Sequence, residues 1–194
     1  MRLILASASP RRRDLLRNAG IDFEVRSGQI VEEIQPEELP EEFARRAARE
    51  KALQIAASVP PNLLVLGADT VVVIDGQTLG KPSDTEDATR MLRLLSGRTH
   101  HVHTGICLVR APDVIEALKH ETTLVTFRQL DEVEIRQYVE SGEPWDKAGG
   151  YAIQGLASKF VTRISGCYSN VVGLPVALLY DALKPLMKAE GSGQ

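Results

Sequence analysis

The junction between a short apolar run and a strongly marked helix start constrains this chain more than any other stretch. Residues 3–6 read Leu-Ile-Leu-Ala, which is enough for a short buried strand and far too little to span a membrane. Ser9 supplies a capping hydroxyl, and Pro10 suits the first helical position. An apolar face continues the helix, which Gly20 ends. The chain therefore begins as a strand followed at once by a helix.

Three arginines crowd the first turns of this helix, at Arg11, Arg12 and Arg13. Because a helix amino terminus is partially positive, each cation there is disfavoured by roughly a few tenths of a kcal/mol. Exposed backbone N–H groups, the Ser7 and Ser9 hydroxyls and the guanidinium groups would together bind a polyanion such as a phosphate chain. The alternative is solvated surface charge. The strand, the Ser-x-Ser-Pro motif and the paired arginines in combination favour the anion site.

Composition narrows the kind of anion. The 194 residues are 43% hydrophobic and 25% charged, which is ordinary for a globular protein and suits one α/β domain or two lobes sharing a sheet. The net charge of −3 excludes the basic field with which proteins bind nucleic acid polymers non-specifically. The cationic groups must therefore act locally, on a small anionic ligand.

The two cysteines, Cys107 and Cys167, are too widely spaced for a zinc knuckle and are typical of a reduced cytosolic protein. No stretch combines the charged start, apolar middle and small-residue cleavage site of a signal peptide. We therefore expect a cytoplasmic protein without membrane association.

Hydrophobic periodicity predicts the helices that follow. Residues 40–57 form one helix, in which Lys51 lies close to the buried stripe and either snorkels to solvent or points inward. Ser83-Asp84-Thr85-Glu86 reads as a capping box that opens a second helix, ended by Gly97. Further helices are expected over 131–139, with a second capping-box start of the Asp-x-x-Glu type at Asp131 and Glu134, and from Pro175 onward. Strands are expected at 63–66, 71–74, 102–109, 122–127 and 160–164.

Asp69 is the strongest candidate for a catalytic residue. It follows the apolar run 63–66, and its small neighbours Gly67 and Ala68 would let a substrate or metal approach the backbone closely. We expect it at the end of a strand, where open α/β sheets bind ligands. The alternative is an aspartate that bonds its own backbone in a turn.

Other polar clusters give weaker indications of metal or phosphate binding. Glu32 and Glu33 could supply an oxygen ligand to Mg²⁺, although acidic pairs usually face solvent. The segment from Gly76 to Lys81 is one residue short of a P-loop, and Pro82 occupies the position of the metal-binding hydroxyl. Lys81 can still contact phosphate as a point charge.

Three histidines, His100, His101 and His103, stand close together in the sequence. Strand alternation places His101 and His103 on one face, but no third ligand for a zinc site is evident nearby. The glycine-rich segment 146–155 is expected to be irregular and to line a binding site.

The ordered set of motifs resembles the Maf-type nucleotide pyrophosphatases, also called septum formation inhibitor proteins, over nearly the whole chain. The motifs are Ser7-Ala8-Ser9-Pro10-Arg11-Arg12, Val31-Glu32-Glu33, Arg49-Glu50-Lys51-Ala52, Gly67-Ala68-Asp69-Thr70, Gly80-Lys81-Pro82, His103-Thr104-Gly105, Asp146-Lys147-Ala148-Gly149-Gly150-Tyr151 and Val172-Gly173-Leu174-Pro175. Each motif is weak alone, and their order along the chain makes the set specific.

The resemblance implies an α/β fold with a mixed twisted sheet, flanking helices and two lobes around a deep cleft, similar to inosine triphosphate pyrophosphatases. It implies one Maf-like domain over residues 1–190, and we expect residues 191–194 to be a disordered tail. The implied reaction is hydrolysis of a nucleoside triphosphate to the monophosphate and pyrophosphate with Mg²⁺ or Mn²⁺. A homodimer is also implied.

The resemblance also carries residue roles. It implies Asp69 as general base, with Glu33 among the cleft residues, and we expect Asp69 and Glu33 to bind the metal. Substrate choice would rest on Arg11, Thr70 and Gln154, and phosphate binding on Ser7, Ser9, Arg12, Lys51 and Lys81. Arg13 lies beyond the matched motif and is expected to be solvated.

The segment Tyr151-Ala152-Ile153-Gln154-Gly155 looks like the subgroup that acts on dTTP and UTP. Two alternatives remain at this point. One is a nucleotide-binding regulator of septum formation with little catalysis, and the other is a pyrophosphatase for another nucleotide such as 7-methyl-GTP.

Overall fold

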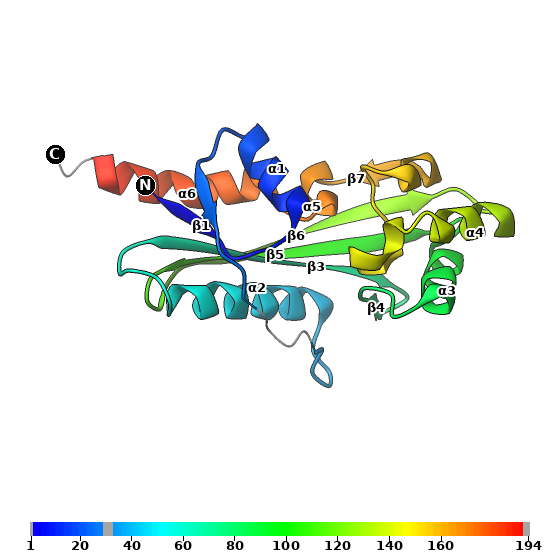
Figure 1. Cartoon of the computed structure of the whole chain (residues 1–194), viewed down its shortest axis with the longest axis horizontal. Helices are drawn as coiled ribbons and strands as arrows, with labels where there is room; N and C mark the ends of the chain where they lie inside the picture. The colour runs from blue at the N-terminus through cyan, green and yellow to red at the C-terminus, as the bar shows by residue number, and fades with distance from the viewer. Residues whose placement is uncertain (1, 29–32, 192–194) are drawn as a thin grey trace. The chain divides into compact units, whose positions relative to one another are not determined.

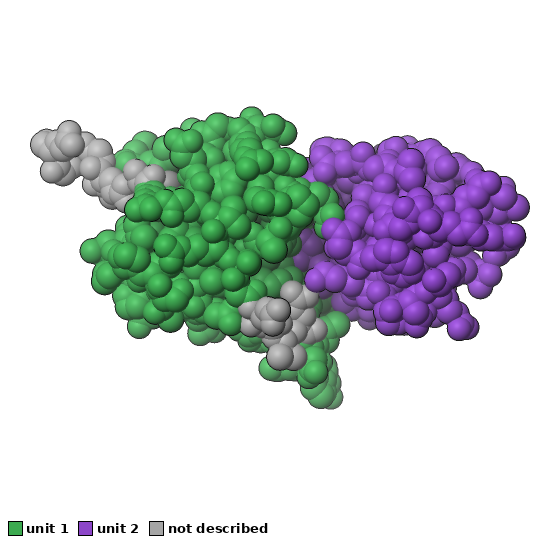
Figure 2. All heavy atoms as spheres, in the orientation of Figure 1, with its two compact units in different colours: residues 1–69, 104–121, 173–194 green, residues 70–103, 122–172 purple. Residues whose placement is uncertain are grey.

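The computed structural model describes residues 2–28 and 33–191, with side chains described up to residue 188. These residues form two compact units (Figure 2). The first unit comprises Met1–Asp69, Thr104–Glu121 and Gly173–Gln194, and the second comprises Thr70–His103 and Thr122–Val172. Two units agree with the expected two lobes, whereas the deep cleft stays a prediction.

A seven-stranded mixed sheet has the order β2-β1-β3-β5-β6-β7, with β4 paired to β3. β1 pairs in parallel with β2 and β3, while the β3–β4 and β6–β7 pairs are antiparallel. The strands are β1 (Leu3–Leu5), β2 (Phe23–Val25), β3 (Leu64–Ile74), β4 (Gln77–Leu79), β5 (Thr99–Arg110), β6 (Val114–Phe127) and β7 (Val161–Ser165). Together with the helices, this sheet confirms the expected mixed α/β class.

Helices flank the strands, and short 3₁₀ helices lie within and on either side of the glycine-rich segment 146–155. Across the described residues, every helix is too short or too polar to cross a bilayer. The α-helices are α1 (Pro10–Asn18), α2 (Pro40–Ala56), α3 (Thr85–Leu95), α4 (Glu132–Glu140), α5 (Tyr168–Val172) and α6 (Val176–Gly191), and the 3₁₀ helices are η1 (Glu143–Asp146), η2 (Ala148–Gly150) and η3 (Leu156–Phe160).

The first unit has three layers, which follow from the alternation of side chains along β1. Leu3 and Leu5 point to one face of the sheet and pack against α1 and α6. Ile4 and Ala6 point to the other face and pack against α2. Figure 1 shows α2 on one side of the strands, with α1 and α6 on the other. Because both faces are covered, β1 is buried along its whole length.

An aromatic cluster forms much of the core of the second unit. Phe127 contacts His100, Tyr151 and Phe160 through ring centroids 4.8–6.0 Å apart, and Phe160 packs in turn on Tyr138. The inward stripe of α3 lies at Ala88, Met91, Leu92 and Leu95, as its helical spacing predicts. These contacts anchor α4 and the irregular segment that follows it.

Several local expectations are confirmed and two are wrong. Asp131 and Glu134 form the expected reciprocal capping box of α4. The cap of α3 is Asp84, whose carboxylate accepts from Asp87 N, rather than a box between Ser83 and Glu86. The physical reason is that Ser83 and Asp84 both carry capping oxygens, and the helix starts one residue later than the Ser83 box requires.

The second error concerns β3. Its predicted halves, 63–66 and 71–74, form one strand of 11 residues, so Asp69 lies in mid-strand rather than at a strand end. The small residues between the halves mask the strand pattern, although they are fully compatible with extended backbone. At the carboxyl end of the chain, α6 extends to Gly191, and residues 192–194 of the expected tail lie outside the described residues.

Candidate active site

Lys51 and Asp69 form a largely buried ion pair in the first unit. Lys51 Nζ donates a hydrogen bond to Asp69 Oδ1 at 2.5 Å, and the two side chains are 15% and 8% exposed. Lys51 therefore turns inward from the edge of the α2 stripe, and of the two possibilities left by the sequence the inward one is correct. Asp69 projects from β3, so the pair joins a helix to the strand that lies beneath it.

Two glycines let α2 approach closely enough for this pair to form. A Cβ on Gly67 would lie 2.0 Å from the backbone oxygen of Ala48, and a Cβ on Gly105 would lie 2.2 Å from that of Ala44. No side chain fits at either position without displacing the helix. Gly67 was expected to admit substrate or metal; the structure instead places the α2 backbone against it.

A second group of candidate residues gathers at the amino terminus of α1. Ser9 caps the helix by accepting a hydrogen bond from Arg12 N. Ser7 Oγ accepts from Ser9 N at 3.3 Å and from Arg12 Nη1 at 3.2 Å, and Arg12 Nε donates to the Gly173 carbonyl at 2.7 Å. The Arg12 side chain is buried, and its contacts order the loop between β1 and α1.

Arg11 and Arg13, on either side of Arg12, are less buried than Arg12. Arg11 is half-buried at the helix start. Arg13 is also half-buried, and its Nε is shielded from solvent. The expectation that Arg13 is solvated is therefore wrong for this atom, because the side chain lies against the protein instead of extending into water.

Glu33 lies in an exposed segment just after the undescribed residues, and the neighbouring Glu32 lies outside the described residues. Arg46 of α2 donates to the Glu33 carbonyl at 2.8 Å and to the Glu38 carboxylate at 2.6 and 2.8 Å. The hydrogen bond from Arg46 lowers the pKa of Glu38. Arg46 thus ties this segment to α2, a role that sequence reasoning missed; its spacing of four residues from Glu50 was the only local signal.

The second unit contains the remaining predicted residues. Thr70 is half-buried on β3, Lys81 is exposed after β4, and Gln154 is exposed in the turn before η3. The segment 146–155 is irregular as expected. The structure thus brings together Lys51 with Asp69, and Ser7 and Ser9 with Arg12, within the first unit.

The histidines behave as strand alternation predicts. The His101 and His103 rings stack with centroids 5.9 Å apart, on the same face of β5. His100 is fully buried, and its Nε2 lies 2.8 Å from the Tyr151 hydroxyl. Among the described residues, no group of three or more His, Cys, Asp or Glu side chains is arranged to hold a metal ion.

Comparisons with known proteins identify the family. The family model described as Maf-like protein matches residues 2–186. A dTTP/UTP pyrophosphatase from Koribacter versatilis is 50% identical over 184 residues, covering 95% of this chain and 94% of the relative. One of the same name from Caldanaerobacter subterraneus is 46% identical over 184 residues, covering 95% and 88%.

Among solved structures, the Ham1 protein of Staphylococcus aureus aligns with 66% of this chain and 72% of its own, at 14% identity and a TM-score of 0.43. The family match over residues 2–186 includes the loop before α1 and the strand that carries Asp69, and each of the two relatives covers 95% of the chain. The chain belongs to the Maf-like protein family.

Proposed function

We propose that this protein is a nucleoside triphosphate pyrophosphatase that hydrolyses dTTP and UTP to the nucleoside monophosphate and pyrophosphate. The observation that carries the proposal is the buried Lys51–Asp69 pair, in a chain whose relatives at 46–50% identity are named dTTP/UTP pyrophosphatase. A buried carboxylate fixed by a lysine is suited to proton transfer at a defined point. The pair therefore gives the reaction class a specific chemical centre.

Asp69 acts as the general base in this proposal. Its carboxylate removes a proton from the attacking water while the water oxygen bonds to the α-phosphorus, and the bond from that phosphorus to the bridging oxygen breaks. Pyrophosphate leaves with the electron pair of the broken bond. Lys51 holds Asp69 Oδ1 in place, which limits the carboxylate to a narrow set of orientations.

The loop before α1 binds the leaving phosphates. Ser7, Ser9 and Arg12 are already joined by hydrogen bonds, so little order has to be gained when an anion binds. The helix amino terminus adds a favourable partial charge. Lys81 of the second unit supplies a further cation that offsets charge developing on the leaving group.

Mg²⁺ or Mn²⁺ would be held by Asp69 and Glu33. Both side chains are hard oxygen donors, and Mg²⁺ uses one or two carboxylates together with substrate phosphates, so a larger protein cluster is unnecessary. The bound ion would neutralise phosphate charge and lower the pKa of a coordinated water.

Arg11, Thr70 and Gln154 select the nucleotide. A carboxamide offers both a donor and an acceptor, so Gln154 can meet a carbonyl and the N–H of uracil or thymine. The proposal also takes residues 1–190 as one domain that forms a homodimer, which light scattering of the purified protein tests.

The deciding experiment compares pyrophosphate release from dTTP, UTP, CTP, GTP, ATP and 7-methyl-GTP, each with Mg²⁺ and with EDTA. We expect turnover of dTTP and UTP that EDTA abolishes. Nucleotide binding without turnover would instead support a regulator of septum formation. Preferred turnover of 7-methyl-GTP would assign the chain to a different substrate.

A further inference from the structure

The turn that carries Gln154 is built to present this side chain. Gly155 N donates to the Ala152 carbonyl at 3.0 Å, which closes a four-residue turn with Gln154 in its third position. Tyr151 and Ile153 before Gln154 are buried, at 6% and 7% exposure, whereas Gln154 itself is exposed. Tyr151 and Ile153 therefore anchor the turn on the core, while the Gln154 side chain is exposed to solvent.

Two side chains that bond to each other hold this turn from both ends. The Tyr138 hydroxyl donates to Glu143 Oε1 at 2.8 Å and accepts from Ala152 N at 3.2 Å, at the start of the turn. Glu143 Oε2 accepts from Leu156 N at 2.9 Å, just after the turn. The backbone on each side of Gln154 is thus fixed to one hydrogen-bonded pair.

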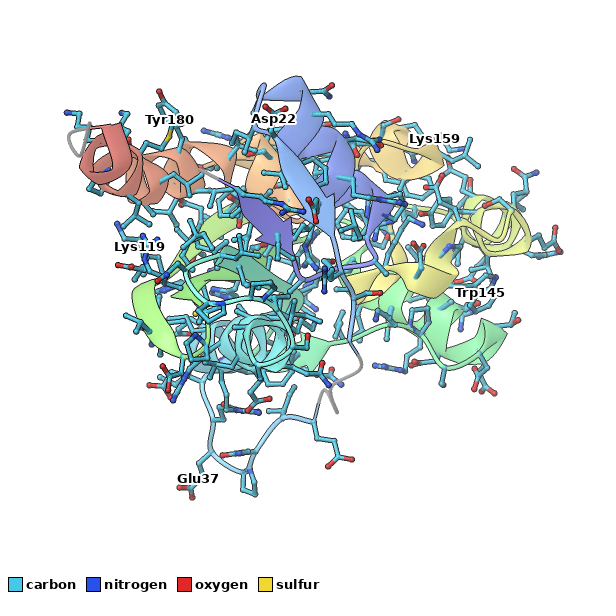
Figure 3. The ribbon with its side chains drawn as sticks, turned by 60° about the vertical axis from the view of Figure 1, so that its left-hand side comes forward. Asp22, Glu37, Lys119, Trp145, Lys159 and Tyr180 are labelled. Carbon is cyan, nitrogen blue, oxygen red and sulfur yellow. The ribbon has the colours of Figure 1, made fainter. Side chains whose placement is uncertain are left out.

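The fit between Glu143 and the turn is close. A Cβ on Gly155 would lie 2.2 Å from Glu143 Oε2 and 2.5 Å from Oε1, so only glycine leaves room for the carboxylate. Glu143 begins η1 directly after Gly142, whose φ of 77° redirects the chain at the end of α4. Figure 3 marks η1 by Trp145 and η3, which follows the turn, by Lys159.

Tyr138 is well suited to act as a fixed support. It is 2% exposed, and its ring packs edge-on against Phe160 at a centroid distance of 5.3 Å. Burial and the bond to Glu143 raise the pKa of its phenol, so the hydroxyl keeps its proton throughout the physiological range. The Tyr138 hydroxyl therefore stays a hydrogen-bond donor to Glu143.

We infer that Tyr138 and Glu143 are positioning residues that set base selectivity by holding the Gln154 turn. The inference rests on the proposed function. A free glutamine amide can rotate to match either uracil, with its N3–H donor, or cytosine, with its N3 acceptor. Selectivity therefore requires a held backbone that favours one orientation of the amide and penalises the other.

The test measures kcat and KM for dTTP and dCTP with the full-length enzyme and Mg²⁺. Glu143→Gln and Tyr138→Phe each remove part of the support, and we expect each to lower the ratio of kcat/KM for dTTP over dCTP by about tenfold. The change should appear mainly in KM for dTTP, because neither residue contacts the phosphates in the proposed mechanism. Glu140→Gln, an exposed glutamate on the same helix, should keep the wild-type ratio.

A double-mutant cycle tests whether the loss of base selectivity comes from the contact between Glu143 and Gly155. Gly155→Ala alone should lower selectivity as Glu143→Gln does, because the new methyl group displaces the carboxylate or the turn. In a Glu143→Ala background, the same Gly155→Ala change should add less than a twofold effect, since the atoms it would meet are gone. Full additivity of the two changes would contradict the inference.

Amide hydrogen exchange at Leu156 N–H, which donates to Glu143, shows whether a variant has loosened the turn and so separates failure of the inference from failure of the proposed function. Faster exchange at Leu156 N–H in Glu143→Gln together with an unchanged dTTP/dCTP ratio would overturn the inference, while the proposed function would stand. Failure of the wild-type enzyme to release pyrophosphate from dTTP or UTP would instead refute the proposed function. Should Glu143→Gln fail to fold, Tyr138→Phe, which keeps the buried ring, decides the question alone.

Discussion

Lys51 Nζ and Asp69 Oδ1 lie 2.5 Å apart across the contact between α2 and β3, with both side chains largely withdrawn from solvent. A buried ion pair contributes little net stability, yet removing one partner leaves the other uncompensated at high cost. The proposed general base is therefore also coupled to the packing of the first unit. Mutations of this pair must be interpreted through both activity and stability.

Asp69→Asn should lower kcat for dTTP by about a thousandfold, because an amide cannot accept the proton of the attacking water. Pyrophosphate release at saturating dTTP and Mg²⁺ measures this loss. Turnover within tenfold of the wild type would exclude Asp69 as the base.

Lys51→Met should lower the free energy of unfolding by about 3 kcal/mol, since it leaves the Asp69 carboxylate buried without its cation. The double variant Lys51→Met, Asp69→Asn should regain much of this stability and none of the activity. Urea denaturation of the two single variants and the double variant measures the coupling. Strictly additive losses of stability would show that the pair does not interact energetically.

Gly67→Ala tests the close approach of α2 to β3. The added Cβ would lie 2.0 Å from the Ala48 oxygen and 2.8 Å from Ala52 N, so the helix must move outward. We expect a loss of about 1–3 kcal/mol of stability and lower kcat, because Lys51 moves with the helix. Gly80→Ala is the matched control for stability, since a Cβ there meets nothing within 4 Å. Equal stability of the two variants would contradict this account of Gly67.

Features with a local cause could be predicted from the sequence. The buried stripe of α3 follows from helical spacing, and the Asp131–Glu134 capping box of α4 from residue types three positions apart. The inward turn of Lys51 was one of two expectations left open. The first two features depend on residues within one element or at its end, whereas the orientation of Lys51 depends on Asp69 in another element.

Features caused by distant parts of the chain could not be predicted in the same way. Gly67 interrupts the apolar pattern of β3 because the backbone of α2 lies against it, and a local stretch of sequence does not reveal this packing. The bond from Arg12 to the Gly173 carbonyl joins residues 161 positions apart. The candidate site is built from such contacts, so its residues could be proposed individually but not their partners.

Ser9→Ala should separate capping from phosphate binding. Loss of the hydroxyl that accepts from Arg12 N should cost about 1 kcal/mol of stability and should raise KM for dTTP. Asp84→Ala removes the comparable cap of α3 and should cost similar stability with KM unchanged. Thermal unfolding and steady-state kinetics on both variants give the comparison. An equal rise of KM in both would mean that Ser9 acts through stability alone.

His100 should make stability depend on pH. Burial lowers its pKa from an ordinary value of 6.5 to about 3, with a smaller contribution from nearby His101. Between these values the unfolded chain binds a proton that the folded chain excludes, so stability falls as the pH decreases below 6.5, by at most about 1.4 kcal/mol per pH unit.

His100→Phe should remove the His100 contribution to the slope of unfolding free energy against pH between pH 6.5 and 4. His101→Gln, a change at an exposed residue, should retain most of the wild-type slope. Since His100 bonds the Tyr151 hydroxyl, His100→Phe also lowers stability at neutral pH, and the slope rather than the absolute value is diagnostic. A slope identical to that of the wild type would show that folding does not lower the pKa of His100, which would contradict this prediction.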